Sequence, residues 1–168
     1  LAEDGGRRQV ITMTDQSVIG VDADSGRLLW RHPFVNKRKN NIPTPIYAQG
    51  SVLAATGYGG GSVRLALAAR DGGVAATPVW TNAALDNCHG GIVLVDGCVY
   101  GSAHEQPAWL CLDFATGAVR YREPGVGMGA VAGAGAAEPH QRIISGRFLL
   151  AAGGRGRAVG AGGCLGPP

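Results

Sequence analysis

The chain has 168 residues, of which 45% are apolar, and its formal net charge is +3, so it is long enough to bury a core. Residues 1–132 contain 11 Lys or Arg and 11 Asp or Glu, and the positive balance therefore comes from residues 133–168. Nucleic-acid binding requires a basic face with interleaved aromatic residues, which this charge distribution does not supply, so no nucleic-acid partner is expected.

The first predicted unit covers residues 9–32. Apolar and polar residues alternate with period two, which predicts three strands at about 9–14, 17–22 and 27–32. Compared with the later units, its innermost strand is missing. We therefore expect the chain to begin inside a unit.

Two complete units of four short strands follow, at residues 42–82 and 88–122. Within them, Gln49-Gly50 and Asp96-Gly97 predict two-residue hairpin turns, and Asp96-Gly97 is the stronger signal because a type I′ turn needs positive φ at both positions. The run Lys37–Lys39 before the first of these units is interpreted as a solvated loop. The expected strands lie at about 42–48, 51–57, 62–68 and 77–82, and at about 90–95, 98–103, 108–113 and 118–122.

The C-terminal region departs from this pattern. Residues 127–132 resemble the first strand of a further unit, but the expected hairpin does not follow. Residues 133–168 are rich in Gly, Ala and Arg, and such a sequence cannot offset its ordering entropy, so a poorly ordered tail is expected. The tail is either natural or translated from a shifted reading frame.

A polar turn followed by an aromatic residue occurs twice, 91 residues apart, and a looser third copy ends at Trp80. Asp and Ser or Thr can accept or donate hydrogen bonds within a turn, and Gly can adopt its left-handed conformation. The aromatic residue is expected to bury its ring against a neighbouring unit. These are structural roles. The matching positions are Gly20, Asp22, Ser25, Gly26 and Trp30 in one copy and Cys111, Asp113, Thr116, Gly117 and Tyr121 in the other.

On these motifs the chain resembles the PQQ-like, or quinoprotein-type, β-propeller repeat proteins, whose tryptophan-docking repeat reads A-x-D-x-x-T-G-x-x-x-W. The resemblance covers roughly residues 9–132 and implies an all-β fold, a partial β-propeller of about two and three-quarter four-stranded antiparallel blades. The family includes exported propeller lipoproteins of outer-membrane assembly and quinone-dependent alcohol dehydrogenases. It implies a periplasmic or exported location, although the chain shows no signal peptide.

The resemblance leaves cofactor binding open. Quinone-dependent dehydrogenases stack pyrroloquinoline quinone (PQQ) on a ring formed by two adjacent cysteines and bind calcium. Here no two cysteines are adjacent and none form a C-x-x-C pair, so neither this cofactor nor a structural zinc ion is expected. Cys98 and Cys111 are expected to be small buried residues on neighbouring strands. No nucleophile-elbow motif occurs, and we assign no catalytic residue.

One polar cluster is peculiar to the last complete unit. If Asp96-Gly97 forms a two-residue turn, paired residues have numbers that sum to 193, and His89 then faces His104. Two imidazoles with Asp86 would be candidate ligands for a metal or an anion. The alternative interpretation is that both histidines are hydrogen-bonded at a loop edge and that Asp86 closes a turn.

These observations favour a non-catalytic propeller module that offers its loops or central funnel to a partner. The alternatives are a fragment of a PQQ- and calcium-dependent alcohol dehydrogenase and a metal or small-ligand site at the histidine pair. The expected partners are missing blades of the same propeller or another protein. No transmembrane segment is expected, because no run of about twenty apolar residues occurs.

Overall fold

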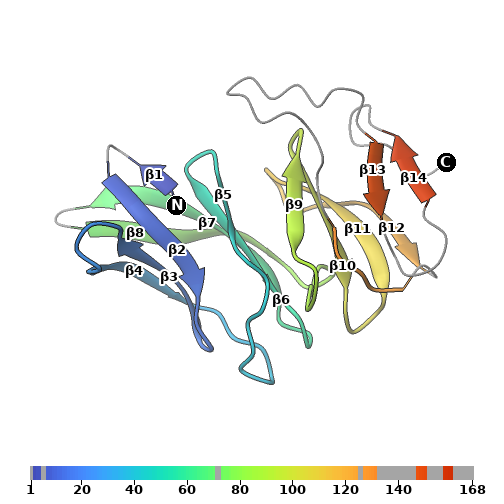
Figure 1. Cartoon of the computed structure of the whole chain (residues 1–168), viewed down its shortest axis with the longest axis horizontal. Helices are drawn as coiled ribbons and strands as arrows, with labels where there is room; N and C mark the ends of the chain where they lie inside the picture. Colours follow the sequence, from blue (N-terminus) through green and yellow to red (C-terminus); the bar gives the residue numbers. More distant parts are fainter. Residues whose placement is uncertain are drawn as a thin grey trace.

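The structure is a computed structural model that describes residues 2–4, 7–70, 73–124, 127–131, 147–150 and 157–160. Within these ranges the chain contains strands, turns and loops and no helix. The strands form three four-stranded antiparallel sheets and one two-stranded sheet (Figure 1). The expectation of an all-β partial propeller of antiparallel blades is confirmed.

The first sheet contains one strand more than the sequence predicted. The short strand β1 lies at its edge and pairs Ala2 with Gln9 of β2, so the expectation of a missing innermost strand is wrong. Three residues are too few to show an alternating pattern, although Ala2 is buried. In order across the sheet the strands are β1 (Ala2–Asp4), β2 (Arg7–Met13), β3 (Ser17–Asp22) and β4 (Leu28–Pro33).

The second and third sheets follow the predicted order and register. Gln49-Gly50 and Asp96-Gly97 form the two-residue turns, and all four residues have positive φ, from 48° to 75°. The second sheet contains β5 (Ile46–Ala48), β6 (Ser51–Thr56), β7 (Gly61–Arg70) and β8 (Gly73–Asn82). The third contains β9 (Ile92–Val95), β10 (Cys98–Ala103), β11 (Ala108–Asp113) and β12 (Val119–Pro124).

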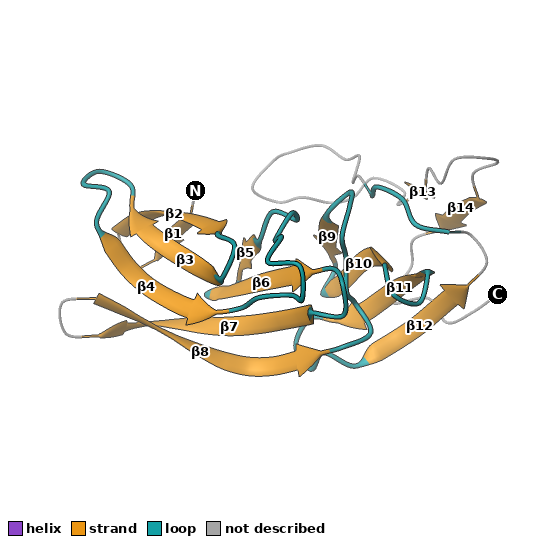
Figure 2. Cartoon of the chain, turned by 90° about the horizontal axis from the view of Figure 1, so that it is seen from below, coloured by secondary structure: helices purple, strands orange, loops and turns teal. Residues whose placement is uncertain are grey.

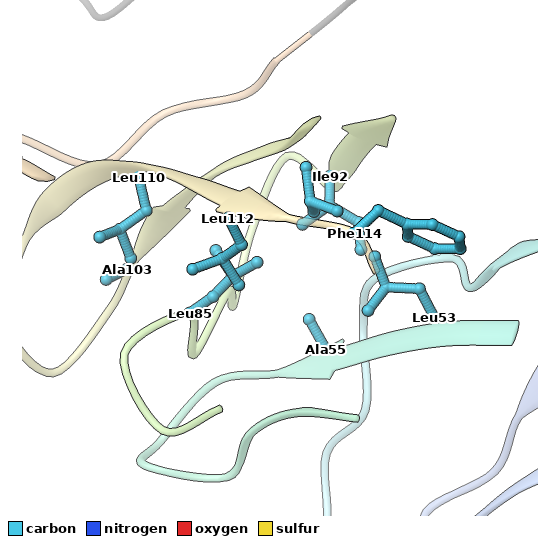
Figure 3. Close-up of a cluster of buried hydrophobic side chains, with 9 residues drawn as sticks. Leu53, Ala55, Leu85, Ile92, Ala103, Leu110, Leu112 and Phe114 are labelled. Atoms are coloured by element: carbon cyan, nitrogen blue, oxygen red, sulfur yellow. The ribbon is translucent and has the colours of Figure 1, made fainter. Parts of the chain in front are cut away.

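The structure has two hydrophobic cores, one on each face of the second sheet. Strand β6 contributes side chains to both, and every residue in it is buried. Its side chains alternate between faces. Val52 and Ala54 pack toward the first sheet with Trp30, whereas Leu53 and Ala55 pack toward the third sheet (Figure 3). The three sheets are therefore stacked face to face as successive blades of a propeller.

The same irregularity recurs in all three sheets. The ladder to the last strand shifts register after Gly20 in the first sheet, after Arg64 in the second and after Cys111 in the third. Each of these residues pairs with an aromatic residue of the last strand, which places Trp30, Trp80 and Tyr121 at equivalent positions. The strands that carry them, β4, β8 and β12, lie along one side of the molecule, opposite β1, β5 and β9 (Figure 2).

Residues 127–131, where a further unit was expected to start, form no strand. They lie against the third sheet instead, because the Ser102 hydroxyl donates to the Gly129 carbonyl at 3.0 Å and the Val131 amide donates to the Gly90 carbonyl at 3.2 Å. From the predicted tail, the structure describes an antiparallel pair, β13 (Arg147–Leu150) and β14 (Arg157–Gly160). The remaining residues of 133–168 lie outside the described residues.

Candidate functional site

The loops that connect successive sheets and the turns between their middle strands gather at one end of the molecule, the lower end in Figure 1. Hydrogen bonds tie these loops together. The Phe34 amide donates to the Gln16 carbonyl at 3.0 Å, and the Asn41 side chain donates to the Thr14 carbonyl at 2.7 Å. This loop end contains the predicted histidine cluster.

The predicted pairing of His89 with His104 is not formed as a ladder pair. The register agrees with the predicted sum within the ladder, but the ladder ends where Ile92 pairs with Gly101. Gly90 and Gly91 have φ values of 79° and 71°, so the backbone leaves the extended conformation before it reaches His89. His89 lies in an exposed loop beyond the sheet.

The buried carboxylate of Asp86 binds main-chain amides. Its Oδ1 accepts a hydrogen bond from the His104 amide at 2.8 Å. Its Oδ2 accepts from the Glu105 amide at 3.0 Å and from the Gly59 amide at 3.2 Å. Asp86 thus joins the turn that follows β10 to the turn that follows β6, and holds the second and third sheets together at their loop end.

The His104 ring belongs to a stack of three side chains. It meets the Tyr58 ring edge-on, with the ring centroids 4.6 Å apart, and the Arg38 guanidinium lies 5.7 Å from the centroid of Tyr58. The Nδ1 atom of His104 is buried, and no described residue gives it a hydrogen-bond partner. A hydrogen bond with the thiol of Cys88 raises the pKa of the Tyr58 hydroxyl.

The donor atoms of this region do not converge. His89 Nε2 lies 3.6 Å from the buried Sγ of Cys88, whereas His104 faces Tyr58. Among the described residues, no group of three or more His, Cys, Asp or Glu side chains is placed to hold a metal ion. Cys98 and Cys111 are buried on β10 and β11.

The repeated polar turn has the same geometry in both full copies. In the first, Asp22 Oδ1 accepts from the Ser25 amide at 2.8 Å and from the Ser25 hydroxyl at 2.7 Å. In the second, Asp113 Oδ1 accepts from the Thr116 amide and the Thr116 hydroxyl, both at 2.8 Å. In both copies, hydrogen bonds from Ser or Thr to the Asp side chain therefore close a turn between two β-strands.

The two aspartates differ in one neighbour. The Arg120 guanidinium forms an ion pair with Asp113 and, together with the Thr116 hydrogen bonds, lowers the pKa of that carboxyl to about 2. At Asp22, the hydrogen bonds from Ser25 are the main cause of its lowered pKa. Both carboxylates are thus ionised structural acceptors at neutral pH.

The second turn is also a docking platform for the preceding sheet. Trp80 Nε1 donates to the Phe114 carbonyl at 3.0 Å, and the Asn82 side chain donates to the Gly117 carbonyl at 2.8 Å. The Arg64 guanidinium lies 4.4 Å from the centroid of the Phe114 ring and donates to the Ala115 carbonyl at 3.1 Å. Three side chains of the second sheet therefore recognise the main chain of one turn in the third.

Trp30 uses a different contact. It is buried in the core between the first and second sheets, and its Nε1 donates to Gln9 Oε1 at 2.8 Å within its own sheet. Its ring covers Gly20, where an added Cβ would lie 2.1 Å from Trp30 Nε1. In the second sheet the ladder of β7 and β8 extends as far as the pair Arg70 and Gly73, so this hairpin is longer than that of the third sheet.

Sequence reasoning missed four contributors to the loop end and the interface, namely Asn36, Tyr58, Arg64 and Asn82. Arg64 offered a signal, because it is a cation inside the otherwise apolar run 63–67. Asn36 and Tyr58 offered none, since an amide or a phenol in a glycine-rich or polar loop is common. Their importance follows from contacts between residues about 20 or more positions apart.

Comparison with known proteins gives one family. Residues 2–123 match the family of PQQ-like repeats described as outer membrane protein assembly factor BamB. No curated protein matches the chain closely enough to count as a relative. In the described residues, no helix is long and apolar enough to cross a membrane. Because the match covers most of the chain and agrees with the three stacked antiparallel sheets, the protein belongs to the PQQ-like repeat family described as outer membrane protein assembly factor BamB.

Proposed function

We propose that this chain is a non-catalytic PQQ-like β-propeller repeat module that acts as a protein-interaction or ligand-binding scaffold in an exported bacterial protein. The observation that carries the proposal is that the polar residues of the repeated turn make structural contacts. Asp113 and Thr116 hold a turn, and Trp80 and Arg64 bind that turn from the neighbouring sheet. Residues that hold the sheets together make the framework rigid, so that its loops keep a fixed position. They do not act as reacting groups.

The family assignment supports the same function at a coarser level. The family description names an outer membrane protein assembly factor, and we propose that this chain also acts by binding another protein. A periplasmic location for this chain is part of the proposal. Scaffold loops presented by a rigid sheet framework are a common way to build binding surfaces.

Further blades of the same propeller are proposed to pack on the third sheet. Tyr121 holds on β12 the position that Trp80 holds on β8, where the aromatic ring binds the next turn. Beside it, Val119 is 43% exposed. A following blade with the same Asp-x-x-Thr-Gly turn would give Tyr121 an equivalent docking platform.

A non-catalytic scaffold does not oxidise alcohols with PQQ, so an assay of PQQ-dependent alcohol oxidation tests the proposal. The purified chain is incubated with PQQ and calcium, and dye-linked oxidation of primary alcohols is followed, with a known quinoprotein dehydrogenase as positive control. We expect no turnover above that of PQQ and calcium without protein. Clear turnover that depends on the chain would contradict the proposal and favour a dehydrogenase.

A further inference from the structure

The connector between the first and second sheets, residues 34–45, is wound around one buried amide. Asn36 is 5% exposed, and its Oδ1 accepts from the Arg38 amide at 2.8 Å and from the Asn40 amide at 3.2 Å. Its Nδ2 donates to the Asn40 carbonyl and to Thr56 Oγ1, both at 2.6 Å. The segment from 36 to 40 is therefore a built turn anchored to the second sheet.

This turn presents three consecutive cations. Lys37, Arg38 and Lys39 are exposed, and Lys39 has a φ of 53°, a left-handed conformation that is uncommon for a residue with a side chain. Within the described ranges the ion pairs are Arg8–Asp24 and Arg120–Asp113, and neither involves the run. The three consecutive side chains are therefore exposed to solvent, and no ion pair within the described ranges neutralises them.

Exposed apolar residues flank the cations in the sequence, and an aromatic ring lies beside one of them. Val35 is 48% exposed and Ile42 is 44% exposed, although both are large hydrophobic residues. Tyr58 lies beneath the Arg38 guanidinium. We define the connector patch as Val35, Lys37, Arg38, Lys39, Ile42 and Tyr58. It combines exposed aliphatic groups and a cationic centre with an Arg–Tyr pair, and Arg and Tyr are the residue types enriched at protein interfaces.

We propose that the connector patch binds an acidic segment of a partner protein, in which aliphatic residues accompany the carboxylates. This inference rests on the proposed scaffold function and names the chemical class of its partner. The cations attract and orient the carboxylates, and the aliphatic groups of the segment cover Val35 and Ile42. Because Asn36 already orders the turn, binding loses less conformational entropy than it would with a flexible loop.

The geometry favours a protein segment over a nucleic acid. One face of Tyr58 lies under Arg38 and its ring meets His104 edge-on, so the ring is already engaged rather than open for base stacking. Outside this run, residues 1–132 contain 8 Lys or Arg against 11 Asp or Glu, a net acidic composition that does not favour an extended basic surface. A phosphate backbone needs such a surface for strong binding.

The test measures fluorescence anisotropy of a labelled peptide of repeated Glu-Glu-Leu triplets, with a Gln-Gln-Leu peptide as neutral counterpart. The native chain is expected to bind the acidic peptide at about 0.02 M salt and more weakly at about 0.3 M, where screening is stronger. The variant Lys37→Glu, Arg38→Glu is expected to lose at least about tenfold in affinity. The control variant Arg27→Glu, Arg70→Glu, with the same change in net charge at exposed positions, is expected to stay within about twofold.

A third variant, Lys37→Gln, Arg38→Gln, removes the charges without reversing them and is expected to weaken binding to a smaller extent. Thermal unfolding confirms that each variant is folded. Equal losses in the patch and control variants would overturn the proposal, because they would indicate attraction by net charge alone. Stronger binding to a single-stranded oligonucleotide or to phosphatidylglycerol vesicles than to the acidic peptide would overturn it as well.

The peptide-binding experiment can fail without contradicting the proposed scaffold function. Quinone-dependent turnover would contradict the scaffold function whatever the peptide does. Absence of selective peptide binding together with absence of turnover would remove only the connector patch as the docking site.

Discussion

Trp80 lies flat against Gly117, across the boundary between the second and third sheets. A Cβ added at Gly117 would lie 2.6 Å from Cδ2 of the Trp80 ring, a distance at which one of the two must move. Gly117 also has a φ of 74°, so glycine is favoured there for two separate reasons. This contact connects the polar turn of one repeat to the aromatic residue of another.

The indole N–H of Trp80 is expected to contribute separately from its ring. In Trp80→Phe an aromatic ring remains, but the Phe114 carbonyl loses a donor at 3.0 Å, so the free energy of unfolding should fall by about 1 kcal/mol. Urea unfolding followed by circular dichroism measures the change. Val79→Ala, at a neighbouring position that is 48% exposed, serves as control and should change stability by less than about 0.5 kcal/mol.

Arg64 is expected to resist conservative replacement. Its guanidinium donates to the Ala115 carbonyl and to Ser51 Oγ, both at 3.1 Å, and covers the Phe114 ring. A lysine ammonium cannot make both hydrogen bonds and also cover the ring as the planar guanidinium does. Arg64→Lys should therefore lower the free energy of unfolding by about 1–2 kcal/mol. The same exchange at exposed Arg70, on the same strand, should be nearly neutral, and comparable losses at both positions would contradict this role.

Asp113 is expected to make stability fall in acid. Its pKa in the folded state is about 2, below the value of about 3.9 in an unfolded chain. Its contribution is therefore present above the unfolded value and is lost as the pH falls through the folded value. Asp113→Asn should lower stability at pH 7 and flatten the decrease between about pH 4 and 2. Chemical unfolding at several pH values measures this, with exposed Asp15→Asn as control. An unchanged acid profile in Asp113→Asn would contradict it.

The histidine cluster is expected to bind zinc weakly or not at all in this chain. The His104 ring packs edge-on against Tyr58, and His89 lies beyond the ladder, beside Cys88. Calorimetric titration with zinc should therefore give the same heats for the native chain and for the His89→Ala, His104→Ala variant. A stoichiometric signal that disappears in the variant would instead assign a metal site to the pair.

The sequence predicted those features that depend on local chemistry. The two-residue turns at Gln49-Gly50 and Asp96-Gly97 fix the register of their hairpins, and period-two alternation locates the strands. The pairing of His89 with His104 was extrapolated from this register. It fails because Gly90 and Gly91 turn the backbone before the ladder reaches His89.

The long-range contacts could not be predicted in the same way. The motif indicated that Trp80 would bury its ring against a neighbouring unit, but not that Arg64 and Asn82 would bind the same turn. Nor does any local pattern show that the Asp86 carboxylate binds the amides of Gly59 and Glu105, which belong to different sheets. Such contacts depend on how the sheets stack, which a single sequence specifies only through all of its packing together.

A pair of glycine substitutions tests most directly whether the repeats are joined by an aromatic residue docked on a polar turn. Gly26 and Gly117 occupy the same turn position with φ values of 71° and 74°, but a Cβ at Gly26 would meet nothing within 4 Å. Gly26→Ala should cost about 1 kcal/mol from backbone strain alone. Gly117→Ala should cost about 1–3 kcal/mol more, because the methyl group displaces Trp80. Urea unfolding of the two variants measures the difference, and equal destabilisation would contradict the docked arrangement.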